Sequence, residues 1–278
     1  MPDDAPRSRA ARRAAEQALV RVVHHYGTRP EFVLLGGLVP ELLCTRTPFQ
    51  HAGTTDVDVQ VDLEIACGVV NAVRLERALR NAEFEPDAQR IWRWKNDRDG
   101  IATVVKFELL ADRDNAETGA TLAFAECAAL GAVNLPGTGF AARDVEIHTL
   151  TARVGDLTRR VEINVAGLGG FLLAKTAAAY SRRKTKDWYD IAFVLLHNDA
   201  GGPEAAAQAV RDRFGAELVG TTRTALRDLL ANFADVHAQG PKAYAEQMCL
   251  DHSELDARTQ AADAVVSVDM FQRILFQR

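Results

Sequence analysis

Two aspartates at positions 56 and 58 are the residues of this chain best suited to chemistry. Val57, Val59 and Val61 alternate with polar residues there, which is the pattern of a β-strand with one apolar face. Residues i and i+2 of a strand project from the same face, so Asp56 and Asp58 are expected to lie side by side. Like charges that close are unfavourable unless water or a cation separates them. The pair therefore indicates a cation site, and the alternative is a solvated acidic edge.

A glycine pair upstream of the aspartates is a candidate phosphate site. Phe32 to Leu35 is a short apolar run typical of a buried strand, Gly36-Gly37 predicts a tight turn, and a helix is expected to start near Val39. Backbone N–H groups at such a turn are open to a phosphate because no side chain blocks the approach. Most glycine pairs are only turns, but one followed by a Thr-x-Asp-x-Asp strand is a more specific signal.

These residues resemble the nucleotidyltransferase superfamily that includes DNA polymerase β, and more narrowly the AbiEii/MenT group of toxins from bacterial toxin–antitoxin systems. The first motif of that group is a diglycine followed by Ser-x-Asp-x-Asp. It matches Gly36, Gly37, Thr54, Asp56 and Asp58, with Thr54 in place of the usual serine. The resemblance covers roughly residues 30 to 197. It implies an α+β fold, with a polymerase β-like mixed sheet core flanked by helices and followed by a helical C-terminal domain.

The resemblance also implies a third carboxylate on a strand beside the first two. In the run Thr103 to Leu110, Lys106 and Glu108 point to one face of a strand and the apolar residues between them point to the other. Glu108 therefore falls where the family more often has aspartate. Asp112 is the alternative if the register of the strand differs.

Lys175 marks a second group of residues. It stands in an apolar, alanine-rich helix, where an unpaired ammonium is costly if buried. Four cations between Ser181 and Lys186 disfavour one continuous helix, and two helices folded across this break would bring Lys175 and Asp190 together. The resemblance, matched by Lys175, Lys186, Asp187 and Asp190, implies that the lysine holds a nucleotide triphosphate and that Asp190 helps to organise the site. The alternative is an ion pair that only joins two helices.

The activity that the resemblance implies is two-metal nucleotidyl transfer. Two Mg²⁺ ions about 3.5–4 Å apart would assist an acceptor hydroxyl in attacking the α-phosphate of an NTP, with pyrophosphate leaving. The implied catalytic residues, of which the first three also hold metal, are Asp56, Asp58, Glu108, Lys175 and Asp190. The implied nucleotide-binding residues are Gly36, Gly37, Thr54, Thr55, Lys175 and Lys186. The implied acceptor is RNA, such as a tRNA 3′ end, and the protein would be a growth-inhibiting toxin with a separately encoded antitoxin.

Two other functions remain open. A small-molecule nucleotidyltransferase of the antibiotic-modifying kind would share the same carboxylates. A catalytically silent module that binds a nucleotide or a partner is favoured by the two departures from the motif, Thr54 for serine and Glu108 for aspartate.

Composition narrows the classes further. The chain has 278 residues, 47% hydrophobic and 26% charged, and a net charge of −5, which argues against a chain-wide nucleic-acid surface but permits a local basic patch. No apolar run reaches the roughly 20 residues that span a bilayer, and the arginine-rich N-terminus is not expected to be a secretory signal. Cys44, Cys67, Cys127 and Cys249 are scattered, which disfavours a zinc site. A cytoplasmic protein without a membrane partner is expected.

Strand patterns give way to helical ones near residue 165. We expect a nucleotidyltransferase core over residues 1–165, with residues 1–8 disordered, and a helical domain over 166–278 that contributes to the active-site cleft. His51 could reach a substrate, but it has no partner in the sequence and is expected to be polar surface. The expected helices span residues 10–26, 66–82, 123–130, 204–214, 217–233, 241–248 and 257–276. Expected strands include 145–150 and 159–165, and Asp99-Gly100 is expected to form the turn of a hairpin.

Overall fold

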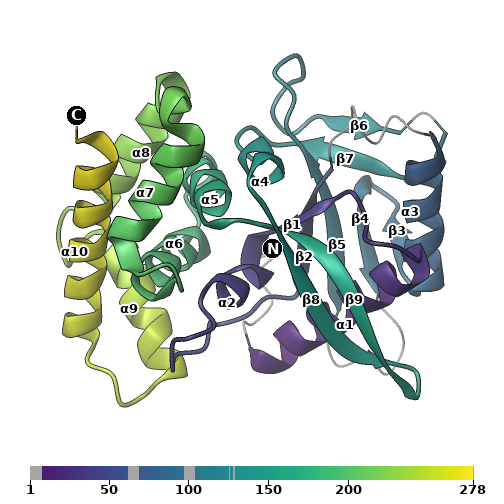
Figure 1. Ribbon diagram of the computed structural model, residues 1–278, viewed down its shortest axis with the longest axis horizontal. Coiled ribbons are helices and arrows are strands. Elements are labelled where there is room, and N and C mark those ends of the chain that lie inside the picture. Colours follow the sequence, from purple (N-terminus) through teal and green to yellow (C-terminus); the bar gives the residue numbers. More distant parts are fainter. Residues whose placement is uncertain (1–7, 62–68, 97–103, 125, 128, 278) are drawn as a thin grey trace. The chain divides into compact units, whose positions relative to one another are not determined.

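The computed structural model describes residues 8–61, 69–96, 104–124, 126–127 and 129–277. The chain folds into two compact units. Unit 1 comprises Met1–Val39 and Gly53–Ala166, and unit 2 comprises Pro40–Ala52 and Gly167–Arg278. Unit 1 holds the sheet and unit 2 holds most of the long helices (Figure 1). Residues 40–52 therefore belong to the helical unit. The sequence patterns indicated a single boundary after residue 165 and did not predict this assignment.

The sheet of unit 1 has nine strands within the described residues. In chain order they are β1 (Val33–Leu35), β2 (Asp56–Gln60), β3 (Glu85–Asp87), β4 (Arg90–Asn96), β5 (Val105–Ala111), β6 (Thr121–Ala123), β7 (Gly131–Asn134), β8 (Val145–Val154) and β9 (Leu157–Ala166). Their spatial order is β3-β4-β5-β2-β1-β9-β8, and β7 pairs with both β5 and β6. The pairs β2–β5, β1–β9 and β5–β7 are parallel and the others antiparallel, so the predicted mixed sheet is confirmed.

The two central strands follow the predicted alternation. Val57 and Val59 of β2 and Phe107 and Leu109 of β5 are fully buried, while the residues between Val57 and Val59 and between Phe107 and Leu109 are half-buried. Burial of one apolar face fixes the register of a strand, because a slip by one residue would bring the polar side chains into the core.

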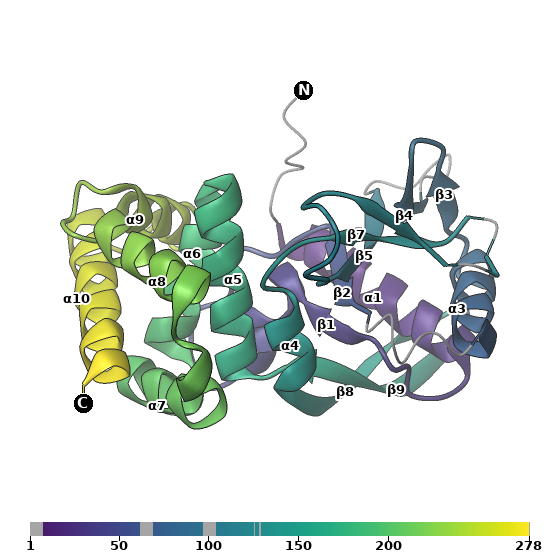
Figure 2. The same cartoon turned by 90° about the horizontal axis from the view of Figure 1, so that it is seen from above.

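Helix α1 (Arg9–Tyr26) confirms the first predicted helix. Ser8 caps its start, because the Ser8 hydroxyl accepts a hydrogen bond from Ala11 N, and Gly27 ends it with φ 84°. The apolar side of α1 packs against α3 (Val69–Asn81) and strands β2, β5, β8 and β9 of the sheet (Figure 2). Residues 62–68 and the Asp99-Gly100 turn lie outside the described residues, as does Cys67.

Of two other helices expected in the first half, one is confirmed and one is wrong. The helix expected to start near Val39 is present as the four residues of α2 (Pro40–Leu43), preceded by a 3₁₀ turn, η1 (Gly36–Leu38). Just beyond α2, the Asp199 carboxylate accepts hydrogen bonds from the backbone N–H groups of Thr45 and Arg46, which ends the helix. None of the described residues in 123–130 is helical, because β6 and β7 pair across this stretch and tertiary pairing overrides a weak local helix preference. The described part instead contains a short helix α4 (Gly139–Arg143).

Unit 2 is helical. Besides α2 it contains α5 (Leu168–Arg182), α6 (Thr185–His197), α7 (Gly202–Phe214), the 3₁₀ turn η2 (Gly215–Glu217), α8 (Gly220–Asn232), α9 (Gln239–Asp251) and α10 (Ala257–Phe276). The predicted break between α5 and α6 is confirmed, with Arg183 in the left-handed conformation at φ 53°. The four helices predicted after residue 200 are confirmed, the last with the predicted bounds 257–276 and the other three with slightly different bounds. No helix in the described ranges is long and apolar enough to cross a membrane.

Candidate functional site

The glycine pair and the aspartate strand meet in unit 1, although they are separate in the sequence. Leu35 of β1 pairs with Asp58 of β2, which brings the following turn beside the Asp58 side chain. Gly36 has φ +81°, and a Cβ at this position would overlap the Asp58 carboxylate. A Cβ on Gly37 would lie 2.9 Å from Cβ of Thr54. Both glycines are therefore required by the close approach of motif side chains.

Thr54 shapes the start of β2. Its hydroxyl accepts a hydrogen bond from Asp56 N at 3.0 Å, a local turn in which serine or threonine bonds the backbone two residues on. Serine offers the same hydroxyl, so the threonine of this chain preserves the contact. Thr55 is 7% exposed, and its expected contact with a nucleotide stays a prediction.

Glu108 lies beside Asp58, as predicted. Strands β2 and β5 run parallel with Asp58 opposite Glu108 and Asp56 opposite Lys106. The alternative, Asp112, lies past the end of β5 and accepts hydrogen bonds from Gly137 N at 2.9 Å and Gly139 N at 3.0 Å. Asp112 thus holds the turn before α4, and the predicted strand register is confirmed.

Two cations accompany the three carboxylates. Arg93 of β4 is opposite Glu108, and its Nε lies 2.6 Å from Glu108 Oε1. Nζ of Lys106 lies 3.9 Å from Asp56 Oδ1. Burial, with the added negative charge of Asp58, raises the pKa of Glu108 to about 7 despite Arg93. Sequence reasoning missed Arg93, because only the register of the β4–β5 hairpin brings it to Glu108.

The carboxylates suit an open magnesium site better than a closed site made of protein ligands alone. Mg²⁺ is usually held by one or two carboxylates together with waters and substrate phosphates. Asp56 and Asp58 are half-buried hard-oxygen donors on one face of β2, and Asp58 lies against the glycine turn. Among the residues that the structure describes, no group of three or more His, Cys, Asp and Glu is gathered as a ready metal site. The ion pair with Arg93 holds Glu108, so the role of Glu108 as third ligand stays a prediction.

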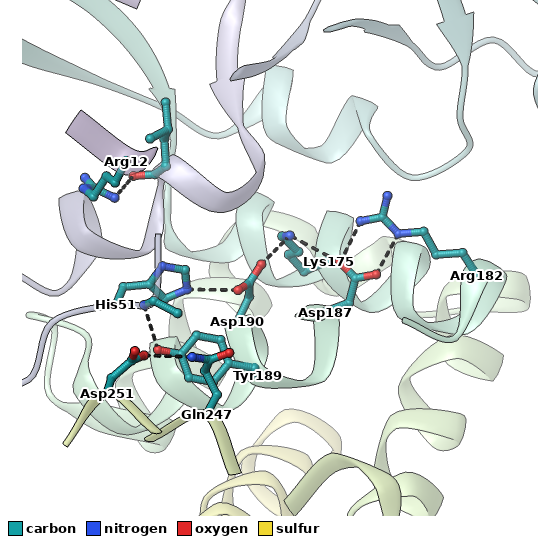
Figure 3. Close-up of polar contacts among 11 residues, drawn as sticks. Arg12, His51, Lys175, Arg182, Asp187, Tyr189, Asp190, Gln247 and Asp251 are labelled. Carbon is teal, nitrogen blue, oxygen red and sulfur yellow. Dashed lines mark hydrogen bonds and ion pairs between the residues drawn. The ribbon is translucent and has the colours of Figure 1, made fainter. Parts of the chain in front are cut away.

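A second polar cluster lies within unit 2, across the break between α5 and α6. Nζ of Lys175 lies 2.6 Å from Asp190 Oδ2 and 3.3 Å from Asp187 Oδ1 (Figure 3). Arg182 binds Asp187 with two nitrogens, each at 2.7 Å. Both aspartate side chains are fully buried. The predicted approach of Lys175 to Asp190 is confirmed.

His51 joins the same cluster, and its expected place on the polar surface is wrong. Its Nε2 lies 2.9 Å from Asp190 Oδ1 and its side chain is fully buried. The next residue, Ala52, donates its N–H to the Tyr189 hydroxyl at 3.0 Å. His51 and Asp190 are 139 positions apart, and no local pattern in the sequence announces their contact. These bonds attach the end of the 40–52 segment to α6.

The charges of the cluster stabilise one another. Burial acts to lower the pKa of Lys175, but Asp190 and Asp187 outweigh it and the pKa is raised. Burial acts to raise the pKa of Asp187, but Lys175 and Arg182 outweigh it and the pKa is lowered. These contacts match the ion pair that joins two helices. The expected roles of Lys175, Asp190 and the half-buried Lys186 at a nucleotide, and a contribution of the helical unit to the catalytic site, stay predictions.

No protein-family model matches the chain, and no curated protein matches it with significant sequence similarity. The resemblance to AbiEii/MenT nucleotidyltransferases therefore rests on the motif residues alone.

Proposed function

We propose that unit 1 is the core of a metal-dependent nucleotidyltransferase that transfers NMP from an NTP to an acceptor hydroxyl. The observation that carries the proposal is the packing of the glycine turn onto the aspartate strand. Gly36 and Gly37 lie against Asp58 and Thr54, so the candidate phosphate site and the candidate metal ligands share one location. A solvated acidic edge requires no such turn beside it.

The chain's own residues have separate tasks in this proposal. The glycine turn lets the NTP phosphates approach the backbone, because it carries no side chain. Asp56 and Asp58 would hold Mg²⁺, which neutralises phosphate charge and activates the acceptor hydroxyl when bound. Arg93 fixes the Glu108 carboxylate, and Lys106 places a positive charge near Asp56. Fixed charges of this kind stabilise a transition state without reorganising during the reaction.

For the acceptor we propose RNA, such as a tRNA 3′ end. For the biological role we propose a toxin that a separately encoded antitoxin neutralises. The motif residues Gly36, Gly37, Thr54, Asp56 and Asp58 support both, through their resemblance to AbiEii/MenT proteins.

The test is to incubate the full chain with Mg²⁺, total RNA and each labelled NTP in turn, and to locate the label on a denaturing gel. We expect label on RNA with at least one NTP. Asp56→Asn and Asp58→Asn should abolish transfer while the melting temperature stays equal or rises, because like-charge repulsion is relieved. Asp156→Asn, at an exposed position, is the matched control and should transfer normally. Undiminished transfer by Asp58→Asn would remove the metal assignment.

One observation favours a second candidate, a nucleotide-binding module without catalysis. The Arg93–Glu108 ion pair occupies the third carboxylate. This candidate predicts that NTP binds with Mg²⁺ in calorimetry but that no label reaches RNA. A small-molecule acceptor is recognised in the same experiment when label moves to an added aminoglycoside and not to RNA.

A further inference from the structure

Arg12 is buried beside the glycine turn of unit 1. Its side chain is 7% exposed, whereas Arg9 and Arg13 on the same helix are exposed. The Arg12 guanidinium donates from Nη1 to the carbonyl oxygen of Leu38 at 3.3 Å (Figure 3). Arginine is a charged residue, and a charged side chain is rarely buried unless it is paired with other polar groups. Leu38 directly follows the glycine pair, so the contact is made with the last residue of the turn.

The first turn of α1 also closes over the start of the aspartate strand. Gly53 has φ +81°, and a Cβ there would lie 2.8 Å from the carbonyl oxygen of Ser8 and 3.0 Å from Cβ of Arg12. The next residue, Thr54, packs on Gly37. The beginning of α1, the glycine turn and the residues before β2 thus form one packed cluster. None of the motif residues lies in α1, so the resemblance by itself does not assign this helix to the candidate site.

We infer that Arg12 is a positioning residue for the triphosphate of the NTP, an inference that rests on the proposed function. Arg12 acts through Leu38: the bond to the carbonyl holds the turn in the form in which Gly36 and Gly37 pack beside Asp58 and Thr54. The guanidinium also binds a carbonyl oxygen whose partial negative charge would oppose a phosphate nearby.

The test is steady-state kinetics of transfer with the full chain, measured well below the melting temperature of each variant. We expect Arg12→Met to raise KM for the NTP about tenfold or more with a much smaller change in kcat. The KM of Arg12→Lys should lie between those of the unmodified protein and Arg12→Met, because lysine keeps the charge but not the planar donor geometry. Arg13→Met is the matched control, since Arg13 is an exposed arginine next in sequence, and its KM should equal that of the unmodified protein.

An unchanged KM in Arg12→Met, with only a lower melting temperature, would overturn the inference and leave Arg12 as a packing residue. If Arg12→Met does not fold, a KM of Arg12→Lys equal to that of Arg13→Met overturns it instead. If the unmodified protein transfers no label, the proposed function fails, and calorimetry with Mg²⁺ and NTP then decides about Arg12. Nucleotide affinity that falls in Arg12→Met but not in Arg13→Met supports the inference. Equal affinities, or no binding to the unmodified protein, reject it.

Discussion

The carboxylate of Asp58 occupies the space where a Cβ on Gly36 would lie. Gly36 directly follows strand β1 and Asp58 is in β2, so the contact joins two motif segments that are separate in the sequence. It explains why this position needs glycine on two grounds, the positive φ and the neighbouring side chain.

Gly36→Ala tests that contact. A left-handed conformation costs a non-glycine residue about 1–2 kcal/mol, and at Gly36 the overlap with Asp58 adds to this. Gly119→Ala is the matched control, because Gly119 has φ +83° with no atom within 4 Å of the added Cβ. In urea unfolding, we expect a loss of stability at least twice as large for Gly36→Ala, together with loss of transfer. Equal losses in the two variants would contradict the proposed packing.

Glu108→Gln and Asp112→Asn separate the two candidates for the third carboxylate. Glu108 lies opposite Asp58, so its neutral variant should lower kcat/KM by about a hundredfold or more if it acts in transfer. Asp112 holds the Gly137 and Gly139 N–H groups, so Asp112→Asn should reduce stability by about 1–2 kcal/mol and leave kcat/KM nearly unchanged. Transfer assays and thermal melts read the two effects. The opposite pattern would assign catalysis to Asp112.

Lys175→Met tests whether the unit 2 cluster acts only in stability. Removing the cation that contacts Asp187 and Asp190 leaves buried carboxylates short of a partner, which typically costs about 3–5 kcal/mol. The double variant Lys175→Met/Asp190→Asn removes one negative charge as well and keeps a polar partner for His51, so its melting temperature should recover substantially. If the recovered double variant transfers normally, Lys175 is a structural residue. If it is folded but inactive, Lys175 or Asp190 takes part in transfer.

The buried His197 should make the free energy of unfolding depend on pH in the acid range. Burial, with His252 adding a smaller effect, lowers the pKa of His197 to about 4, and its Nε2 lies 2.9 Å from the Tyr244 hydroxyl. An unfolded histidine binds a proton below about pH 6.5, whereas the folded one does so only near pH 4. The unfolded state therefore binds more protons between these values, and the free energy of unfolding should fall by up to about 3 kcal/mol as pH drops from 6.5 to 4.

The control for this prediction is His197→Phe. The variant loses the bond to Tyr244 and should be less stable at pH 7, but its stability should vary less between pH 6.5 and 4. Urea unfolding at several pH values measures both quantities. Identical pH slopes in the two proteins would show that His197 does not govern the response.

The sequence by itself determined features that depend on neighbouring residues. The alternation of valines with Asp56 and Asp58 put both carboxylates on one face of a strand, because side chains of a strand point to alternate faces. The cluster of cations before Asp187 marked the break between α5 and α6, and with it the approach of Lys175 to Asp190. Periodicity, turn residues and crowded charges act within a few positions, so they can be read in order along the chain.

Only the tertiary structure decided which distant residues became partners. Arg93 faces Glu108 through the β4–β5 register, His51 bonds Asp190 across 139 positions, and Arg12 bonds Leu38 across 26. Residues 40–52 belong to the helical unit, although in the sequence they stand between β1 and β2 of the sheet. Each of these contacts depends on strand register or on the packing of whole elements. Register and packing are set by the burial of many side chains at once, and the residues next to His51 or Arg12 in the sequence do not indicate them.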